Sequence, residues 1–141
     1  MSGKFTAQVE AIVAKSEKRM TALARESIQD VINDAQLKRS EGGRMRIDIG
    51  FLRASGQGSY TGMPTGPSRP PADAKPGSFD YNASQTETML AQLKIGAVFY
   101  FGWTAFYAKY REAYDGFLGV AVQKWPDIVK RNTEKIKARI K

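Results

Sequence analysis

The sequence predicts an α+β protein: a long N-terminal helix and a kinked C-terminal helix packed on a small antiparallel sheet, with a long flexible loop. Three observations predict this. Residues 4–38 carry apolar side chains at spacings of three and four, which is typical of an amphipathic helix. Residues 93–101 alternate between two faces, as a strand does. Residues 117–141 return to the helical spacing. With 141 residues the chain has the length of one domain, and we expect residues 1–141 to form a single one.

The first helix is expected to run from Lys4 to about Lys38. Its apolar stripe comprises Phe5, Val9, Ile12, Val13, Met20, Leu23, Ala24, Ile28, Val31, Ile32 and Ala35. The glycines at positions 42 and 43 are expected to stop it. At about 1.5 Å per residue, such a helix is about 50 Å long, which is longer than a domain of this size is wide. We therefore expect a neighbour to bury part of the stripe.

The middle of the chain contains one strand candidate and one long loop. Residues 44–55 alternate apolar and charged side chains until Gly50 breaks the pattern, so a short strand is expected there. Residues 56–86 hold five of the six prolines and no Val, Ile or Leu. Their only large anchors are Tyr60, Phe79 and Tyr81. We expect this segment to be an extended loop without a fixed shape in the free protein.

The last part of the chain should contain a strand, a turn and a closing helix. Leu93 to Phe101 is the strongest strand pattern in the sequence. The aromatic residues that follow recur at three and four, which indicates a turn or short helix. The closing helix begins at Phe117. Because Pro126 lacks a donor for an earlier carbonyl, it should kink this helix or begin a second one.

The residue types present argue against an enzyme. The chain contains neither cysteine nor histidine, which removes the commonest nucleophile, the commonest general base and both main zinc ligands. Asp30 and Asp34 could hold a cation, but two carboxylates one turn apart more often form a solvated face. The pair Glu112 and Asp115 is similarly read as an exposed acidic turn. We expect no catalytic residues, no metal and no cofactor.

The positive charge lies mainly at the C-terminal end. The net charge is +8, and residues 117–141 contribute seven basic and two acidic side chains. Such a field favours polyanions or an acidic protein surface. A basic nucleic-acid-binding domain is therefore one hypothesis. The aromatic side chains, however, cluster in the apolar strand and not among the basic residues, which is typical of a core and not of stacking platforms.

Two short segments resemble the signatures of a known family. Many small neck proteins of long-tailed bacteriophages carry Pro-Val-Asp-Thr-Gly-x-Leu-Arg-x-Ser after a long first helix, and Pro-Tyr-Ala-x-x-x-Glu-x-Gly after a later strand. This chain has Arg46-Ile47 in place of Pro-Val and Phe106 in place of the second Pro. The residues that match are Asp48, Gly50, Leu52, Arg53 and Ser55 in the first motif, and Tyr107, Ala108 and Glu112 in the second, which Gly116 follows.

The resemblance implies a structural protein of the virion. Its members are similar to tail-completion components, which form rings around the DNA channel and join tail to head. The expected partners are further copies of the chain in a ring, with six the expected number, other neck and tail proteins, and the DNA that passes through. The expected location is the head–tail junction, with the host cytoplasm as the place of assembly. A tail-terminator ring is the nearest alternative. No membrane is expected, because no apolar run approaches about 20 residues.

Two contacts follow from this interpretation. Arg53 has a planar fork that suits a carboxylate, and Glu112 is its expected partner if the two motifs adjoin; both could instead be unpaired surface charges. The basic face of the last helix is expected to dock on another virion protein in preference to DNA, since strong phosphate contacts would hinder DNA that must slide. The residues of this face are Lys130, Arg131, Lys135, Lys137, Arg139 and Lys141.

Overall fold

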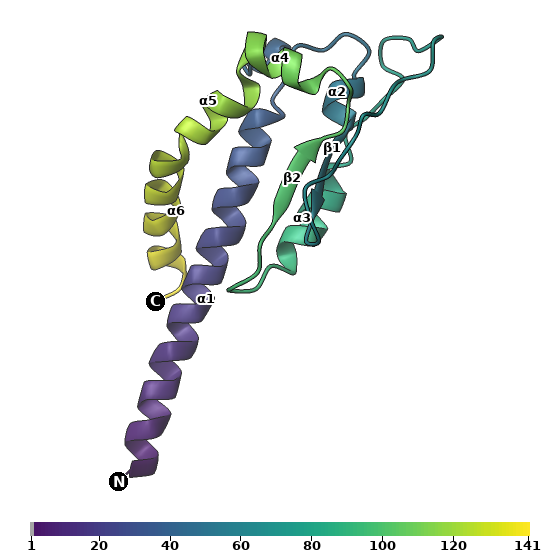
Figure 1. Ribbon diagram of the computed structural model, residues 1–141. Coiled ribbons are helices and arrows are strands. Elements are labelled where there is room, and N and C mark those ends of the chain that lie inside the picture. The colour runs from purple at the N-terminus through teal and green to yellow at the C-terminus, as the bar shows by residue number, and fades with distance from the viewer. Residues whose placement is uncertain (1) are drawn as a thin grey trace.

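A long helix, α1, runs through the molecule, and the remaining elements pack around its C-terminal half (Figure 1). The computed structural model describes residues 2–141. In chain order the helices and strands are α1 (Ser2–Ala35), a 3-10 turn (Arg39–Glu41), α2 (Phe51–Ala54), β1 (Gly56–Ser59), α3 (Ala83–Ala91), β2 (Tyr100–Trp103), α4 (Ala108–Asp115), α5 (Phe117–Gln123) and α6 (Trp125–Arg139). The predicted α+β class is confirmed. None of the helices in the described part is long and apolar enough to cross a membrane.

The C-terminal helices α5 and α6 lie along α1, and in the view of Figure 1 the sheet lies on the other side of α1. Strands β1 and β2 pair antiparallel, with Gly56 opposite Trp103 and Ser59 opposite Tyr100. Helix α3 packs on β1. The predicted break at Pro126 is confirmed, because this residue stands in the first turn of α6, where a missing backbone N–H costs nothing. The short helix expected after the aromatic strand is present as α4.

A chain of edge-to-face aromatic rings connects the sheet to α5. Tyr81 contacts Phe101, Phe101 contacts Trp103 and Trp103 contacts Phe117, with centroid separations of 6.4, 5.2 and 5.0 Å. Phe117 belongs to the central core cluster together with Met45, Leu52 and Ala105. Aromatic pairs in this geometry contribute beyond their buried area. The two sides of α1 are thereby joined into one packed unit.

The sheet differs from the one that the sequence predicts. The strand expected over residues 44–55 does not form: Gly50 turns the chain and α2 follows it. The strand lies instead at β1, within the glycine-rich segment that reads as a loop. A Cβ at Gly58 would lie 2.4 Å from the ring of Phe99, so glycine is needed for the ring to cover the strand. Strand β2 is shorter than the predicted run from Leu93, because β1 offers only four residues to pair with.

Two helices also depart from expectation. Helix α1 ends at Ala35, before the glycines, since Lys38 is already extended and bridges to Met45. Helix α3 was not predicted. Its signal is Asn82, whose side chain accepts a hydrogen bond from the backbone N–H of Gln85 at 3.1 Å and so caps the helix.

Candidate functional site

The first motif folds as a bend followed by one helical turn. Gly50 has a φ of +89°, and a Cβ there would lie 2.9 Å from the carbonyl oxygen of Phe79. Glycine is therefore required at this position. The bend lets α2 begin at once and buries Leu52, as expected; its exposed fraction is 3%. Ser55 Oγ donates to the carbonyl oxygen of Leu52 at 2.7 Å and closes the end of α2.

Gln36 joins this bend to α1 and to the sheet. Its side chain is buried. Nε2 donates to the carbonyl oxygen of Arg53 at 3.0 Å, and Oε1 accepts from Trp103 Nε1 at 2.8 Å. In return, Arg53 Nε donates to the carbonyl oxygen of Gln36 at 2.7 Å. The Arg53 guanidinium also lies over the ring of Tyr81, 5.3 Å from its centroid. These contacts make Arg53 a clamp between elements.

The second motif packs against the first. Tyr107 and Ala108 stand at the start of α4 and lie on the core cluster that contains Leu52. Burial raises the pKa of the Tyr107 phenol above its ordinary value, and the nearby Asp48 carboxylate acts in the same direction. The phenol is therefore neutral at physiological pH. The structure thus brings together two motif segments that are more than fifty residues apart in the sequence.

The last motif residues shape the junction between α4 and α5. The Glu112 carboxylate accepts hydrogen bonds from the backbone N–H groups of Leu118 and Gly119, both at 2.8 Å. It therefore caps the N-terminus of α5, where unpaired N–H groups favour a negative charge. Gly116 lies between the two helices with a φ of +66°.

The expected pairing of Arg53 with Glu112 is wrong within one chain. Arg53 is engaged by Gln36, and Glu112 by the first turn of α5. The alternative, that both are unpaired surface charges, is wrong as well. The physical reason is that each side chain finds backbone partners closer than the other motif residue.

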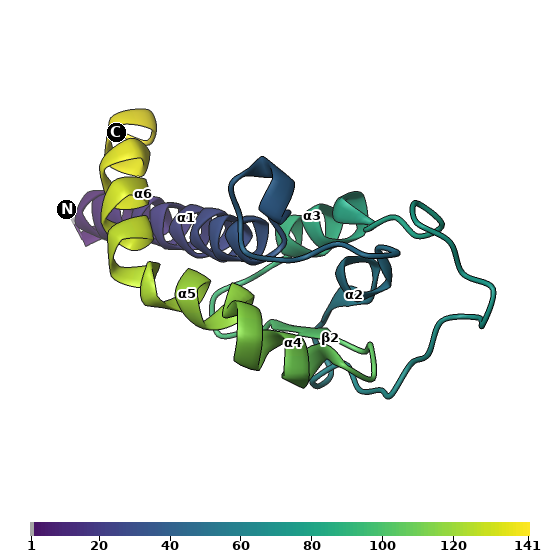
Figure 2. The same ribbon diagram turned by 90° about the horizontal axis from the view of Figure 1, so that it is seen from above.

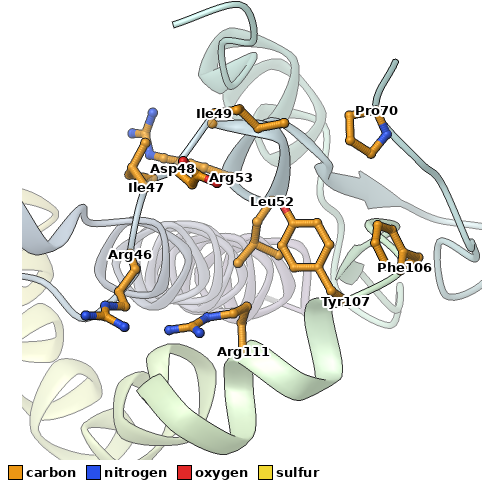
Figure 3. A pocket seen from close by; sticks show the side chains of 11 residues that line it. Arg46, Ile47, Asp48, Ile49, Leu52, Arg53, Pro70, Phe106, Tyr107 and Arg111 are labelled. Carbon is orange, nitrogen blue, oxygen red and sulfur yellow. The ribbon is translucent and has the colours of Figure 1, made fainter. Parts of the chain in front are cut away.

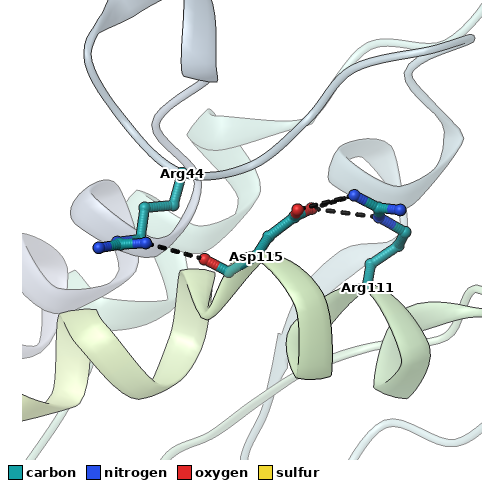
Figure 4. A network of polar contacts seen from close by, with 3 residues as sticks. All are labelled: Arg44, Arg111 and Asp115. Atoms are coloured by element: carbon teal, nitrogen blue, oxygen red, sulfur yellow. Dashed lines mark hydrogen bonds and ion pairs between the residues drawn. The ribbon is translucent and has the colours of Figure 1, made fainter.

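Arg111 and Asp115, both within the second motif segment, form an ion pair (Figure 4). The Arg111 guanidinium donates to both carboxylate oxygens of Asp115 at 2.7–3.1 Å. Arg44 Nη1 reaches the backbone carbonyl oxygen of Asp115 at 3.4 Å. These contacts fix α4 to the segment that leads into the first motif. The expectation of an exposed acidic turn at Glu112 and Asp115 is therefore wrong, because both carboxylates have partners.

A cavity of about 550 Å³ opens where the two motifs meet (Figure 3). Its lining includes the motif residues Asp48, Gly50, Leu52, Arg53 and Tyr107 and, outside the motifs, Arg46, Ile47, Ile49, Pro70, Phe106 and Arg111. The Arg46 and Arg111 side chains lie together at one end in Figure 3, and Pro70 and Phe106 lie at the other. The lining contains three guanidinium groups and one carboxylate, that of Asp48. The cavity therefore combines an apolar wall with a net positive end.

This arrangement is suited to binding an apolar or acidic group of a partner. Among residues 2–141 there is no group of three acidic side chains that could hold a metal ion. Arg53 and Arg111 are already held by other groups, while Arg46 is exposed. A partner's carboxylate would meet Arg46 first. The raised pKa of the Tyr107 phenol keeps this group of the lining protonated.

The basic residues of the last helix divide into two groups. Arg131 pairs with Asp30 at 3.3 Å, and Arg139 pairs with Glu26; Asp34 pairs with Lys124 at 3.1 Å. These contacts hold α5 and α6 on α1, so Asp30 and Asp34 neither face solvent alone nor form a cation site. The remaining four are exposed, and none of them takes part in an ion pair within the described residues: Lys130, Lys135, Lys137 and Lys141.

Sequence reasoning missed several residues of the site. Gln36 is the most important of them. Its signal was available, since it follows Ile32 by four residues and thus lies on the apolar face of the helix. A polar side chain at such a position must find buried partners. Pro70, Arg46 and Arg111 carry no comparable signal, because only the folded chain brings them to one cavity.

Comparison of the chain with protein-family models, with curated proteins and with solved structures gives no match. The resemblance to phage neck proteins therefore remains a hypothesis.

Proposed function

We propose that this chain is a structural virion protein of a phage neck, which forms a homo-oligomeric ring and joins tail to head around the DNA channel. The observation that carries the proposal is the meeting of the two motif segments. Residues that match the family signatures line one cavity and share one core cluster. Such a meeting is expected if the two signatures describe one functional surface, and it is not expected of two chance matches.

The shape of the chain also supports assembly. The N-terminal half of α1 and the outer part of the loop, residues 71–78, both extend away from the packed core (Figures 1 and 2). Residues 71–78 make only local turns of their own, such as Ser78 N–H to the carbonyl oxygen of Lys75 at 3.1 Å. Extensions of this kind acquire contacts when neighbouring subunits or rings are added.

In this proposal the cavity receives a segment of a neighbouring neck or tail protein. An apolar side chain would enter between Leu52 and Phe106, and an acidic group beside it would meet Arg46. Arginine suits this role because its fork binds a carboxylate through two parallel hydrogen bonds. The cavity is thus a docking site and carries no reaction.

The exposed lysines of α6, with Lys141 just beyond its end, supply a second docking surface. Because Arg131 and Arg139 are used within the chain, the basic surface is smaller than the sequence indicates. Four lysines that are spread over three turns suit a salt-dependent contact with an acidic protein rim. They form a weaker footprint for DNA, which favours closely spaced phosphate contacts. The nucleic-acid-binding alternative therefore loses most of its support.

Complementation of assembly tests the proposal. In the phage that encodes the chain, deletion of its gene should yield unjoined tails and DNA-filled heads, as counted by electron microscopy. The native gene should restore joined particles. A variant with Lys130, Lys135, Lys137 and Lys141 changed to Gln should restore few, since it lacks the α6 contact.

The matched control changes Lys75 and Lys94 to Gln, which are exposed and lie outside α6; it should restore joining fully. Normal joining in the complete absence of the gene would contradict the proposed function. Normal joining by the four-lysine variant, followed by defective DNA ejection, would instead place α6 at the channel.

A further inference from the structure

The first half of α1 is exposed to solvent along its length. Residues 3–18 are all exposed, and Figure 1 shows this half extending beyond the end of α6. Its large apolar side chains have exposed fractions between 42% and 69%: Phe5, Val9, Ile12, Val13 and Met20. A helix in water without tertiary contacts is marginally stable, and such a continuous apolar stripe is a usual mark of an interface.

The exposed stripe continues the face on which α6 packs. In the second half of α1 that face presents Ser27, Asp30 and Asp34, which contact Asn132, Arg131 and Lys124. Counting back by three and four residues leads to Met20, Ser16, Val13 and Val9. Helix α6 stops level with Arg19, whose Nε donates to the carbonyl oxygen of Ile140 at 2.7 Å. The free half therefore presents a helix-binding face beyond the point where α6 ends.

The charges beside the stripe have opposite signs on its two edges. At about 100° of rotation per residue, Lys4 and Lys15 lie on one edge, and Glu10 and Glu17 lie on the other. The pairs are separated by eleven and by seven residues, that is, by nearly whole numbers of turns. Each edge therefore carries one sign along its length.

This pattern selects the orientation of a second helix of the same kind. When two identical helices pack side by side and parallel, the lysine edge of one faces the glutamate edge of the next. When they pack antiparallel about a two-fold axis, lysine meets lysine and glutamate meets glutamate, which is unfavourable. Cyclic symmetry also places neighbouring helices parallel when they follow the ring axis. Each copy then contacts one neighbour through its lysine edge and the other neighbour through its glutamate edge.

We infer that residues 4–20 of α1 form the contact between neighbouring copies of this chain, with their helices parallel and the lysine edge of one copy on the glutamate edge of the next. The inference rests on the proposed function, because the cyclic symmetry of the copies comes from the proposed ring. The partner is a second copy and not another protein, since the two edges of one helix are complementary to each other.

Disulfide crosslinking of the full chain tests the orientation, because the native sequence has no cysteine. Val9→Cys and Met20→Cys are made as two separate single variants. Ala7→Cys, on the opposite face of the helix, is a third single variant and serves as the control. Where two parallel helices pack with their apolar stripes together, a residue of the stripe lies near its own counterpart. Both variants should therefore give covalent dimers on mild oxidation, and the control should not. The two positions are about 16 Å apart along the helix, whereas a disulfide needs Cα atoms within about 7 Å.

In an antiparallel pair, a residue lies beside its own counterpart at only one position along the helix axis. A crosslink from just one of the two variants would therefore overturn the parallel arrangement, and a crosslink from neither would overturn the interface. Circular dichroism establishes that each variant is folded, which is expected because these side chains are exposed.

Charge reversal tests the complementarity of the edges. Glu10→Lys with Glu17→Lys makes both edges basic, and should raise the dissociation constant between copies by about tenfold, as measured by analytical ultracentrifugation. Adding Lys4→Glu and Lys15→Glu to the same chain exchanges the edges and should restore association. Unchanged association of the double variant, or failure of the fourfold variant to recover, would overturn the charge argument.

The inference and the proposed function can fail separately. Parallel crosslinks in purified protein support the interface even if deletion of the gene leaves head–tail joining intact. Conversely, unjoined heads and tails together with an absence of crosslinks would leave the neck function standing and refute this interface.

Discussion

Gln36 is the residue through which α1, the bend at Gly50 and strand β2 contact one another. It accepts from Trp103 and exchanges hydrogen bonds with Arg53. A buried polar group of this kind is stabilising only when all of its partners are present, since each unpaired group costs free energy. The orientation of the first motif therefore depends on one side chain that lies outside it.

Replacing Gln36 tests this role. Gln36→Ala should lower the free energy of unfolding by about 3 kcal/mol, because it leaves Trp103 Nε1 and the carbonyl oxygen of Arg53 without their partner and opens a small cavity. Chemical denaturation monitored by tryptophan fluorescence gives the value. Gln57→Ala, at an exposed position of β1, is the control and should change it by less than about 0.5 kcal/mol. A loss below about 1 kcal/mol for Gln36→Ala would show that Arg53 is held in another way.

At the scale of single residues, the sequence predicts which side chains are buried better than it predicts which groups they contact. The burial of Leu52 beneath the bend follows from its place after Gly50, and it is confirmed. The partner of Glu112 could not be predicted, because it depends on the angle between α4 and α5 at Gly116. That angle brings two backbone N–H groups within 2.8 Å of the carboxylate.

The helices α1 and α6 are joined by a partly polar seam. Asn132 is fully buried; its Nδ2 donates to Ser27 Oγ at 3.2 Å and to Asp30 Oδ2 at 2.9 Å. The Arg131 and Arg139 ion pairs flank this contact. Polar groups within a helix pair fix the register of the two helices at a cost in stability. The seam therefore accounts for where α6 ends along α1, and hence for how much of α1 stays free.

The loop has one anchored part and one free part. Ser68 forms an isolated bridge with Ala105, which lies just beyond the end of β2, and Arg69 stacks on Phe106 with its guanidinium 4.3 Å from the ring centroid. The expected anchors Tyr60, Phe79 and Tyr81 each contact another aromatic ring. Residues 71–78, however, are almost entirely exposed. The mobility that the sequence predicts for residues 56–86 is therefore expected mainly in this outer part.

Limited proteolysis tests this expectation. Proteinase K should cut the free subunit first between residues 71 and 78, since a protease needs an exposed segment that can unfold locally. Trypsin is unsuitable, because Arg69 and Lys75 are both followed by proline. The fragments are identified by intact-mass measurement. First cleavage within α6 or the second half of α1 would contradict the assignment of the loop as the least stable element.

Helices were easier to predict than strands for a physical reason. The stripes of α1 and of α5–α6 follow from local spacing, and Pro126 marks its own position. Strand β1 consists of Gly-Gln-Gly-Ser, and its glycines serve the rings of Phe99 and Phe101, which lie more than forty residues away. A strand whose composition is set by a distant partner carries no local signal. For the same reason the cavity could not be predicted beyond its motif residues.

The whole molecule has surfaces that a single copy does not use. These are the stripe on the first half of α1, the cavity between the motifs and the exposed lysines of α6 together with Lys141 beyond its end. The elements that carry them, namely the first half of α1, α2 with α4, and α6, lie at different places on an elongated subunit (Figure 1). A ring uses such surfaces in a consistent way, since lateral contacts close the ring and axial contacts bind the neighbouring rings. For the proposed ring, we therefore propose α1 as the lateral contact, and the cavity and α6 as the axial ones.

The central claim is most directly tested by locating the chain in purified phage particles. Cryo-electron microscopy of the head–tail junction, with mass spectrometry to establish that the chain is present, should reveal one ring of this subunit between head and tail. The first halves of α1 in that ring should lie parallel. Absence of the chain from joined particles, or its location in the head shell or along the tail, would contradict the account.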